Sequence, residues 1–365
     1  MRILFLNTFP VWGGDENWTI NSAKGLSERG HHVVIASLPG SEIEKRAVEN
    51  GINVFPFKLK WDISFWKIPG FRKYLRENKI DVAVCVQNRD VKIGALAARL
   101  EGVKAIFSRQ AIDAVEKKRP YHKLAFTKYV DGIITNTVSI KNLYESYNWF
   151  KKDFIHVIYD GFTMPEKLVK IDLHKEFDLN PGSKIIMGTG RLHEQKRFDL
   201  LIKVAAMAKQ QQLNWNIIVA GTGRLENELK QMAKEMGVQE IIKFIGFRKD
   251  ILNLMYSSDL FVLSSDTEGM SNALKEAMAV GLPCVSTNVY GVEELFQNGK
   301  SGVMVNKGDA EAIFEGIKTV FENKELRESI SYNGKELIKT VFTMDSMIDN
   351  IENLFISKLK ETSPL

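Results

Sequence analysis

The stretch LFVLSSDTEGMSNALKEAMAVGLPCVST, residues 260–287, holds a strand, a helix and a second strand in direct succession. Its two ends are short apolar runs, which are typical of parallel strands buried on both faces of a sheet. Between them we expect a short helix from Ala273 to Val280, with Asn272 as its N-cap and Gly281 at its end. The stretch therefore predicts one repeat of a doubly wound α/β fold.

The same alternation of apolar runs and helical segments extends through the chain of 365 residues. A polar stretch containing Pro165 interrupts it, and we place an interdomain linker near residues 162–170. We expect two doubly wound parallel-sheet domains, residues 1–165 and 171–342, with a cleft between them as the default active site. The tail, residues 343–360, is predicted to form a long amphipathic helix.

The charge balance is mildly basic, with 50 Lys and Arg against 45 Asp and Glu. Nucleic-acid binders usually carry a stronger and more clustered excess, so we expect no nucleic-acid partner. The excess fits either an ordinary solvated surface or attraction to an anionic substrate or membrane.

The chain shows no sign of export or of a membrane span. No stretch reaches 18 apolar residues, and the N-terminal apolar run predicts a strand and not a signal peptide. The two cysteines, Cys85 and Cys284, lie in apolar runs, which fits buried thiols in a reducing compartment. We therefore expect a cytoplasmic protein.

Two cations follow the first strand of the second domain. In GTGRLHEQK, residues 188–196, a glycine turn presents Arg191 and Lys196 just before a helix. A guanidinium fork and an ammonium point charge together suit a pyrophosphate, although two solvated loop cations are the alternative. His193, between them, is more readily interpreted as a loop residue than as a catalyst.

Two carboxylates bracket the start of the predicted helix. Glu268 precedes it and Glu276 lies about a turn inside it. Carboxylates accept hydrogen bonds from vicinal hydroxyls, and the free N–H groups of residues 269–273 could hold an anion between them. Sugar, phosphate and ribose in a row have the shape of a nucleotide sugar. The alternative is two exposed glutamates near a helix.

Glycines mark two further turns. Gly13 and Gly14 lie between the first strand and the first helix, where backbone N–H groups can approach an anion. Gly221 and Gly223 end another strand, in AGTGRLENEL, and could serve packing only. Neither turn is a G-x-G-x-x-G fingerprint, which disfavours a dinucleotide-dependent dehydrogenase.

These motifs, in this order, resemble the retaining GT-B glycosyltransferases of family 4, also called group 1 glycosyltransferases. Glu268 and Glu276 match the family's Glu-x7-Glu motif. Further matches are GGDE at 13–16, RGHHV at 29–33, GTGRLHEQK at 188–196, AGTGRLENEL at 220–229 and GVEEL at 291–295. The resemblance implies two Rossmann-like domains, with the tail helix packed back on the first. It also implies a nucleotide-sugar donor with no metal and no cofactor, and the sequence shows no metal-ligand spacing of His and Cys.

The resemblance also implies roles for individual residues. Arg191 and Lys196 would stabilise the leaving diphosphate, Glu268 would bind the donor sugar, and Glu276 would bind the ribose. The remaining expected donor contacts are Gly14 at the diphosphate, Gly269, Met270, Ser271 and Asn272 at the phosphate and sugar, and Gly246, Phe247 and Arg248 at the base.

One departure concerns the first domain. Many relatives carry a histidine near the anomeric centre, but here the corresponding loop is expected to be FSRQAID, with Arg109 and Gln110 as candidates for contact with donor or acceptor. The nearest histidine, His122, is expected on a helix.

Basic and aromatic residues mix in two segments, 58–79 and 115–128. They suit an anionic membrane surface or a phosphorylated acceptor, or they are core aromatics beside solvated lysines. The resemblance implies transfer of a sugar from a UDP- or GDP-sugar to a glycan or lipid-linked acceptor, in surface polysaccharide or lipopolysaccharide biosynthesis, at the inner face of the membrane or free in the cytoplasm. The alternatives are a nucleotide-sugar epimerase of the same fold and a non-catalytic nucleotide- or glycan-binding module.

Overall fold

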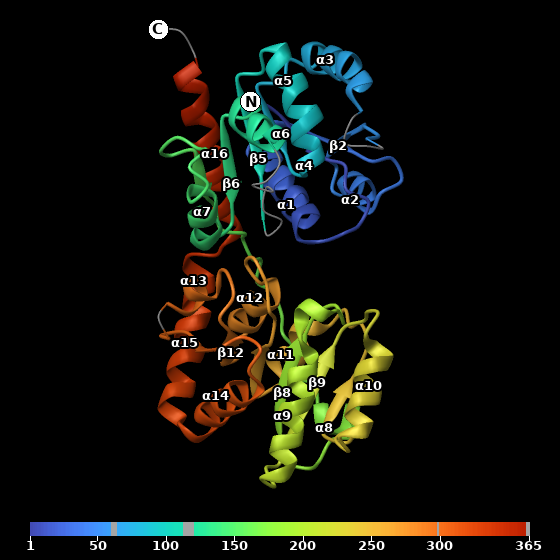
Figure 1. The fold of residues 1–365 in the computed structure, drawn as a ribbon, viewed down its shortest axis with the longest axis vertical. Helices are drawn as coiled ribbons and strands as arrows, with labels where there is room; N and C mark the ends of the chain where they lie inside the picture. The colour runs from blue at the N-terminus through green and yellow to red at the C-terminus, as the bar shows by residue number, and fades with distance from the viewer. Residues whose placement is uncertain (60–63, 112–119, 298, 363–365) are drawn as a thin grey trace. The chain divides into compact units, whose positions relative to one another are not determined.

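The computed structural model describes residues 1–59, 64–111, 120–297 and 299–362. The chain divides into two compact units, each with its own parallel sheet (Figure 1). Unit 1 comprises Met1–Gly161 with Met344–Leu365, and unit 2 comprises Phe162–Thr343. The boundary thus falls where the predicted linker begins.

Unit 1 is built on a seven-stranded sheet in the order β3-β2-β1-β4-β5-β6-β7, with every pair parallel. Its strands are β1 (Arg2–Asn7), β2 (His32–Ser37), β3 (Asn53–Pro56), β4 (Val82–Cys85), β5 (Ala105–Arg109), β6 (Gly132–Thr135) and β7 (Ile155–Val157). Its helical segments are α1 (Gly14–Glu28), α2 (Glu42–Glu49), η1 (Phe65–Lys67), α3 (Ile68–Glu77), α4 (Asn88–Asp90), η2 (Val91–Ala95), α5 (Leu96–Glu101), α6 (Pro120–Leu124), η3 (Ala125–Tyr129), α7 (Val138–Glu145) and α16 (Met344–Thr362). The central strands are buried on both faces, which explains their continuous apolar sequences.

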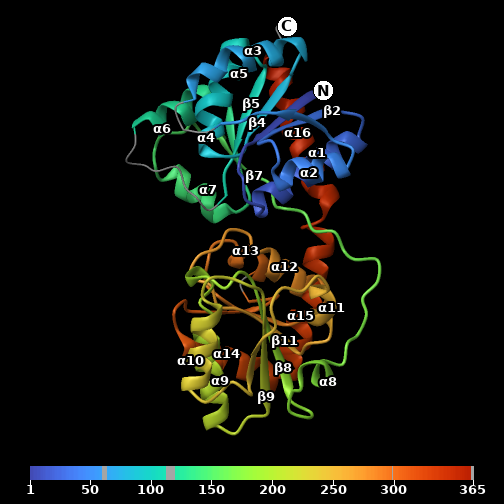
Figure 2. The same ribbon diagram turned by 90° about the vertical axis from the view of Figure 1, so that its right-hand side faces the viewer.

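The tail helix α16 packs against α1 and the sheet of unit 1 (Figure 2). Its residues Ile348, Ile351 and Phe355 are buried in the core, and the Phe355 ring stacks on that of Phe107 at 5.3 Å. Gly25 of α1 makes room for this contact, because a Cβ there would lie 2.6 Å from Cγ1 of Ile348. The end of the sequence therefore completes the fold of its beginning.

Ion pairs also link α16 to Arg29 and His31 of unit 1. Glu352 accepts from Arg29 at 2.7 Å and contacts Nε2 of His31 at 2.7 Å, and Asp349 pairs with Arg29 at 2.6 Å. These pairs are partly exposed, so burial of the apolar stripe contributes more to holding α16 than they do.

Unit 2 repeats the architecture with a six-stranded parallel sheet in the order β10-β9-β8-β11-β12-β13. Its strands are β8 (Lys184–Thr189), β9 (Trp215–Ala220), β10 (Ile242–Phe244), β11 (Leu260–Leu263), β12 (Cys284–Thr287) and β13 (Val303–Val305). Its helical segments are α8 (Leu173–Phe177), η4 (Glu194–Lys196), α9 (Phe198–Gln210), α10 (Glu226–Glu235), α11 (Ile251–Tyr256), α12 (Asn272–Ala279), α13 (Val292–Phe296), α14 (Ala310–Glu322) and α15 (Lys324–Thr340).

The chain enters and leaves unit 2 at one place. The N–H of Phe162 donates to the carbonyl of Phe342 at 2.7 Å, and Phe162 bridges to Thr343 in parallel. Unit 2 is therefore an insertion between two segments of unit 1.

Both cysteines are buried, as expected. Burial raises the pKa of the Cys85 thiol and that of the Cys284 thiol well above the usual range. Neither is therefore a thiolate near neutral pH.

Candidate functional site

The candidate site in unit 2 starts from two loops joined at the carboxyl ends of neighbouring strands, β8 and β11. The N–H of Asp266 donates to the carbonyl of Gln195 at 2.9 Å, and Nε2 of Gln195 donates to the carbonyl of Thr267 at 2.8 Å. Ser264 adds a hydrogen bond from its hydroxyl to the carbonyl of Lys196 at 2.8 Å. These bonds fix both loops against each other.

The joined loops bring Lys196 and Glu268 together as an ion pair. Glu268 is only 9% exposed, and its Oε1 also accepts from the hydroxyl of Ser265 at 2.8 Å. Its Oε2 has no hydrogen-bond donor among the residues that the structure describes. One carboxylate oxygen is thus fixed by the protein and the other remains an acceptor for a ligand hydroxyl.

Arg191 lies on the loop between β8 and η4 and is exposed. Within the described part of the chain, no acidic side chain pairs with it. On this loop, the charge of Lys196 is balanced by its ion pair with Glu268, whereas the charge of Arg191 is not balanced by an ion pair with any described residue.

The glycines of the two loops after β8 and β9 are needed by the fold. A Cβ on Gly221 would lie 1.9 Å from the carbonyl oxygen of Gly190, and one on Gly223 would lie 2.3 Å from that of Leu192. Gly221 also has a φ of +144°, which side chains rarely adopt. Close packing against the loop after β8 accounts for these two glycines. This agrees with the interpretation of AGTGRLENEL as a turn whose glycines serve packing only.

Helix α12 begins beside the ion pair, and its cap corrects the prediction. Ser271 is the N-cap, in extended conformation (φ −66°, ψ 114°), and its hydroxyl accepts from the N–H of Leu274 at 3.4 Å. Asn272, predicted as the cap, is instead the exposed first residue of the helix. The N–H groups of Asn272 and Ala273 have no intrahelical acceptor and are free for an anion. Gly269 and Met270 form the approach to this helix, and the side chain of Met270 is buried.

Glu276 lies in the second turn of α12 and is half-buried. Burial raises the pKa of its carboxyl to about 7, against a smaller opposing effect of the Lys275 charge. No hydrogen-bond donor reaches it within the described residues. A ligand hydroxyl could satisfy this carboxyl.

The segment predicted to border the base follows β10. The carbonyl of Gly246 accepts from the N–H of Gly221 at 2.8 Å, which ties it to the glycine loops. Phe247 is 71% exposed and presents a free aromatic face. Arg248 is engaged by Asp250 at 2.6 Å and by Glu176 at 2.5 Å, so it supports the loop.

In unit 1, the structure places the other predicted residues near the carboxyl ends of the strands. Gly14 opens α1 after Gly13, and nothing lies within 4 Å of where its Cβ would be. His122 is on α6, as expected, and is buried.

Arg109 corrects the prediction of a loop, because Ser108 and Arg109 end strand β5. Arg109 is 1% exposed and pairs with Asp160 at 2.8 Å, with its guanidinium 5.0 Å from the Trp18 ring centroid. The neighbouring Gln110 is also buried and donates to the hydroxyl of Ser108 at 2.8 Å.

Sequence reasoning missed the residues that support these groups. Ser265 and Asp160 were not singled out, although each lies at the carboxyl end of an apolar run predicted as a strand, where parallel-sheet ligands bind. Asp90 was also missed. It is buried, accepts from the hydroxyl of Thr8 at 2.5 Å, and burial raises its pKa to about 6.

Two features are absent from the described residues. No group of three or more His, Cys, Asp or Glu in them is arranged to hold a metal ion. None of the helices that the structure describes has both the length and the apolar character needed to cross a membrane.

Comparison with known proteins identifies both halves of the chain. The family model for glycosyl transferases group 1 matches residues 169–337, and the model for glycosyltransferase family 4 matches residues 12–163.

Curated relatives carry related activities. A UDP-Gal:α-D-GlcNAc-diphosphoundecaprenol α-1,3-galactosyltransferase of Escherichia coli is 28% identical over 304 residues, 78% of this chain and 77% of that protein. The lipopolysaccharide core biosynthesis glycosyltransferase LpsE of Rhizobium meliloti is 29% identical over 236 residues, 65% of this chain and 67% of that protein.

Among solved structures, Anabaena HepE in complex with UDP matches with a TM-score of 0.85 at 21% identity, covering 98% of this chain and 100% of that chain. Two Rossmann-like units that match such a structure define the GT-B class of fold, which confirms the expected architecture of each unit. Within that class, the chain belongs to the group 1 glycosyltransferases of the family 4 type, and it is a glycosyltransferase.

Proposed function

We propose that the protein transfers a sugar from a UDP- or GDP-sugar to a glycan or lipid-linked acceptor, with retention of configuration and without a metal ion. The observation that carries this proposal is the succession of Glu268, the start of α12 and Glu276 in unit 2, with Lys196 paired to Glu268. The order of hydroxyl acceptor, anion-binding helix start and second hydroxyl acceptor matches the order of sugar, phosphate and ribose in a nucleotide sugar, and Lys196 adds a cation for the phosphate.

In this proposal the donor is held from both ends. The free Oε2 of Glu268 accepts hydroxyls of the sugar, and Glu276 accepts hydroxyls of the ribose. The N–H groups at the start of α12 and the exposed Arg191 contact the diphosphate. Phe247 offers its face to the base.

The leaving diphosphate needs stabilisation as the sugar departs. Lys196 and Arg191 supply two positive charges from the loop that is hydrogen-bonded to the segment before α12, and these charges would provide electrostatic stabilisation of the kind that a divalent cation gives elsewhere. In the retaining reaction that we propose, the departing phosphate helps to deprotonate the acceptor hydroxyl on the same face of the sugar.

The choice of donor and acceptor rests on the relatives. The E. coli relative uses UDP-galactose and a diphosphoundecaprenol-linked acceptor, and the R. meliloti relative acts in lipopolysaccharide core biosynthesis. We extend these two classes, a nucleotide sugar and a surface-glycan acceptor, to this chain.

A thermal-shift panel of UDP-, GDP- and ADP-sugars tests the donor, since a bound ligand raises the apparent melting temperature by mass action. We expect a shift with a UDP- or GDP-sugar that is absent in Glu276→Ala. Folded protein that shifts with none of them would overturn the proposal.

Product analysis tests the reaction. Release of free nucleotide together with a glycosylated acceptor supports transfer and not epimerisation, and the anomeric configuration of the product tests retention. Unchanged turnover in EDTA tests metal independence.

Peripheral contact with an anionic membrane is part of the same proposal. Phe65 and Trp66 are 51% and 64% exposed next to Lys67 on η1, whereas Phe71 of the same segment is buried in the core. Five further residues of this prediction, Lys60, Trp61, Lys117, Lys118 and Arg119, lie outside the described residues. Vesicle flotation with phosphatidylglycerol tests it, and Trp66→Ala is expected to reduce binding.

A further inference from the structure

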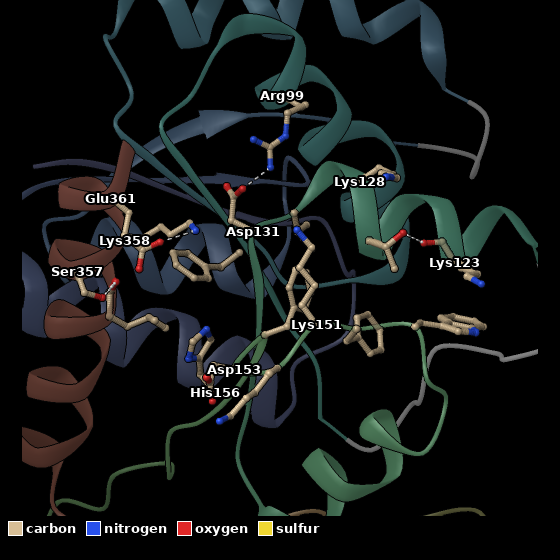
Figure 3. Close-up of a pocket in the computed structure, with 18 residues that line it drawn as sticks. Arg99, Lys123, Lys128, Asp131, Lys151, Asp153, His156, Ser357, Lys358 and Glu361 are labelled. Atoms are coloured by element: carbon tan, nitrogen blue, oxygen red, sulfur yellow. Dashed lines mark hydrogen bonds and ion pairs between the residues drawn. The ribbon is translucent and has the colours of Figure 1, made fainter. Parts of the chain in front are cut away.

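A cavity opens in unit 1 at the edge of the sheet where β6 and β7 begin. Its walls include Asp131 just before β6, Asp153 just before β7 and the last turns of α16 (Figure 3). Its volume is about 850 Å³, which is within the range of small-molecule sites. Arg109 and Gln110 lie at the opposite, carboxyl edge of this sheet, so the cavity is separate from the predicted acceptor side.

The lining of the cavity is strongly basic. Its basic side chains are Arg99, Lys123, Lys128, Lys151, Lys152 and Lys358, and its acidic ones are Asp131, Asp153 and Glu361. Arg99 pairs with Asp131 at 2.6 Å and Lys358 with Glu361 at 2.9 Å (Figure 3).

The other four lysines of the lining form no ion pair with any residue that the structure describes. Two of them lie on the consecutive segments α6 and η3, the other two lie in the turn before β7, and all four line the same cavity. Several unpaired ammonium groups in the lining of one cavity favour a multivalent anion such as a phosphate or pyrophosphate.

Aromatic rings form another part of the wall. Trp149, Phe150 and Phe154 are half-buried and contact one another, with ring centroids 6.1 Å apart for the first pair and 5.3 Å for the stacked Phe150–Phe154 pair. Such rings offer a flat apolar surface on which a nucleotide base can stack.

His156 also lines the cavity, with its ring centroid 6.2 Å from that of Phe107. Gly132 makes room for it, because a Cβ there would be 2.9 Å from Nε2 of His156. The lining of the cavity thus combines four lysine ammonium groups, unpaired among the described residues, with flat aromatic rings.

We propose that this cavity binds a phosphorylated ligand that carries a flat or apolar group, with the lysines on the phosphate and Trp149, Phe150 and Phe154 on the flat group. A free nucleotide, with its flat base, and a phospholipid, with apolar acyl chains beside its phosphate, share this chemistry. The site is additional to the donor site, all of whose predicted carboxylates lie in unit 2.

The test is a titration of the full chain with the fluorescent nucleotide mant-ADP. Lys151→Glu with Lys152→Glu is expected to weaken the cavity's binding component at least tenfold, while Lys45→Glu, on an exposed position of α2, leaves it unchanged. Lys196→Ala with Glu276→Ala is expected to retain it. Trp149→Leu is expected to weaken mant-ADP but not inorganic pyrophosphate, because only the stacking surface is lost.

Competition distinguishes the two sources. Displacement by pyrophosphate but not by monomeric dihexanoyl phosphatidylglycerol assigns the site to free nucleotides or phosphates, and stronger displacement by the lipid assigns it to headgroups. The proposal is overturned if no component survives Lys196→Ala with Glu276→Ala, if the Lys151→Glu and Lys152→Glu protein, shown to be folded by circular dichroism, binds as the wild type does, or if Lys45→Glu weakens binding equally.

Discussion

The ammonium of Lys196 is held by the carboxylate of Glu268, across the ends of two adjacent strands of unit 2. Both residues are predicted to contact the donor, one at the diphosphate and the other at the sugar. Their pairing keeps a cation and an anion together in a poorly solvated place without a net charge, and an arriving phosphate would share Lys196 with Glu268.

Lys196→Ala is expected to lower the rate of transfer by at least about 100-fold, because the leaving diphosphate loses a positive charge. The fold should remain intact by circular dichroism. Lys203→Ala, on an exposed position of the neighbouring helix α9, is the matched control and should transfer normally. Near wild-type turnover of Lys196→Ala would refute the phosphate role.

Glu276→Gln is expected to change how stability depends on pH. The pKa of the Glu276 carboxyl is raised to about 7 from an ordinary value near 4.5, so the wild type loses stability as the pH rises through that window. The amide does not ionise, so the variant should be more stable at pH 8 by about 1–3 kcal/mol and similar at pH 4. Urea unfolding at both pH values measures this, with Glu228→Gln on α10 as an exposed control.

The same substitution separates stability from function. If Glu276 binds the ribose, Glu276→Gln weakens UDP or GDP binding even though the protein is more stable at pH 8. Unchanged nucleotide affinity would remove Glu276 from the donor site.

Gly221→Ala and Gly14→Ala are expected to have opposite effects on the fold. A Cβ at Gly221 would lie 1.9 Å from backbone, at a φ of +144°, so we expect a loss of more than about 2 kcal/mol in the free energy of unfolding. Gly14 has open space around it and a place in the first turn of α1, so the alanine variant should be at least as stable as the wild type. Any loss of donor affinity in Gly14→Ala then reports on close approach of the diphosphate, and an unchanged KM would argue against it.

Gly25→Ala should destabilise unit 1 by pushing against Ile348 of α16, by about 1–3 kcal/mol. Ile348→Ala alone should cost about 2–5 kcal/mol because it leaves a cavity. The double variant should be more stable than the sum of the two losses predicts, since the added methyl then enters the vacated space. Strict additivity in urea unfolding would show that the two residues do not share this contact.

The parallel strands could be predicted because a strand buried on both faces must be apolar throughout, and runs such as those of β4 and β11 are continuous in sequence. The positions of Lys196, Glu268 and Glu276 could be predicted because each has a fixed offset from such a run. What could not be predicted depends on partners distant in sequence. Arg109 reads as a loop residue until its ion pair with Asp160, 51 residues later, is known.

One helix cap and one helix were missed for a local reason. Both Ser271 and Asn272 are good capping residues, and only the backbone conformation shows that the serine is the last extended one. Helix α15 was not predicted at all, although its cap, Asn323, accepts from the N–H of Leu326 at 2.9 Å and interrupts what otherwise reads as one long helix from Ala310.

The return of α16 to unit 1 has a consequence for biosynthesis. A ribosome makes unit 2 completely before it makes the helix that buries Ile348, Ile351 and Phe355 against the first strands. Although unit 1 starts first, it keeps an open apolar face until α16 has been synthesised. Termination before Met344 would therefore damage the half of the protein that was translated earlier.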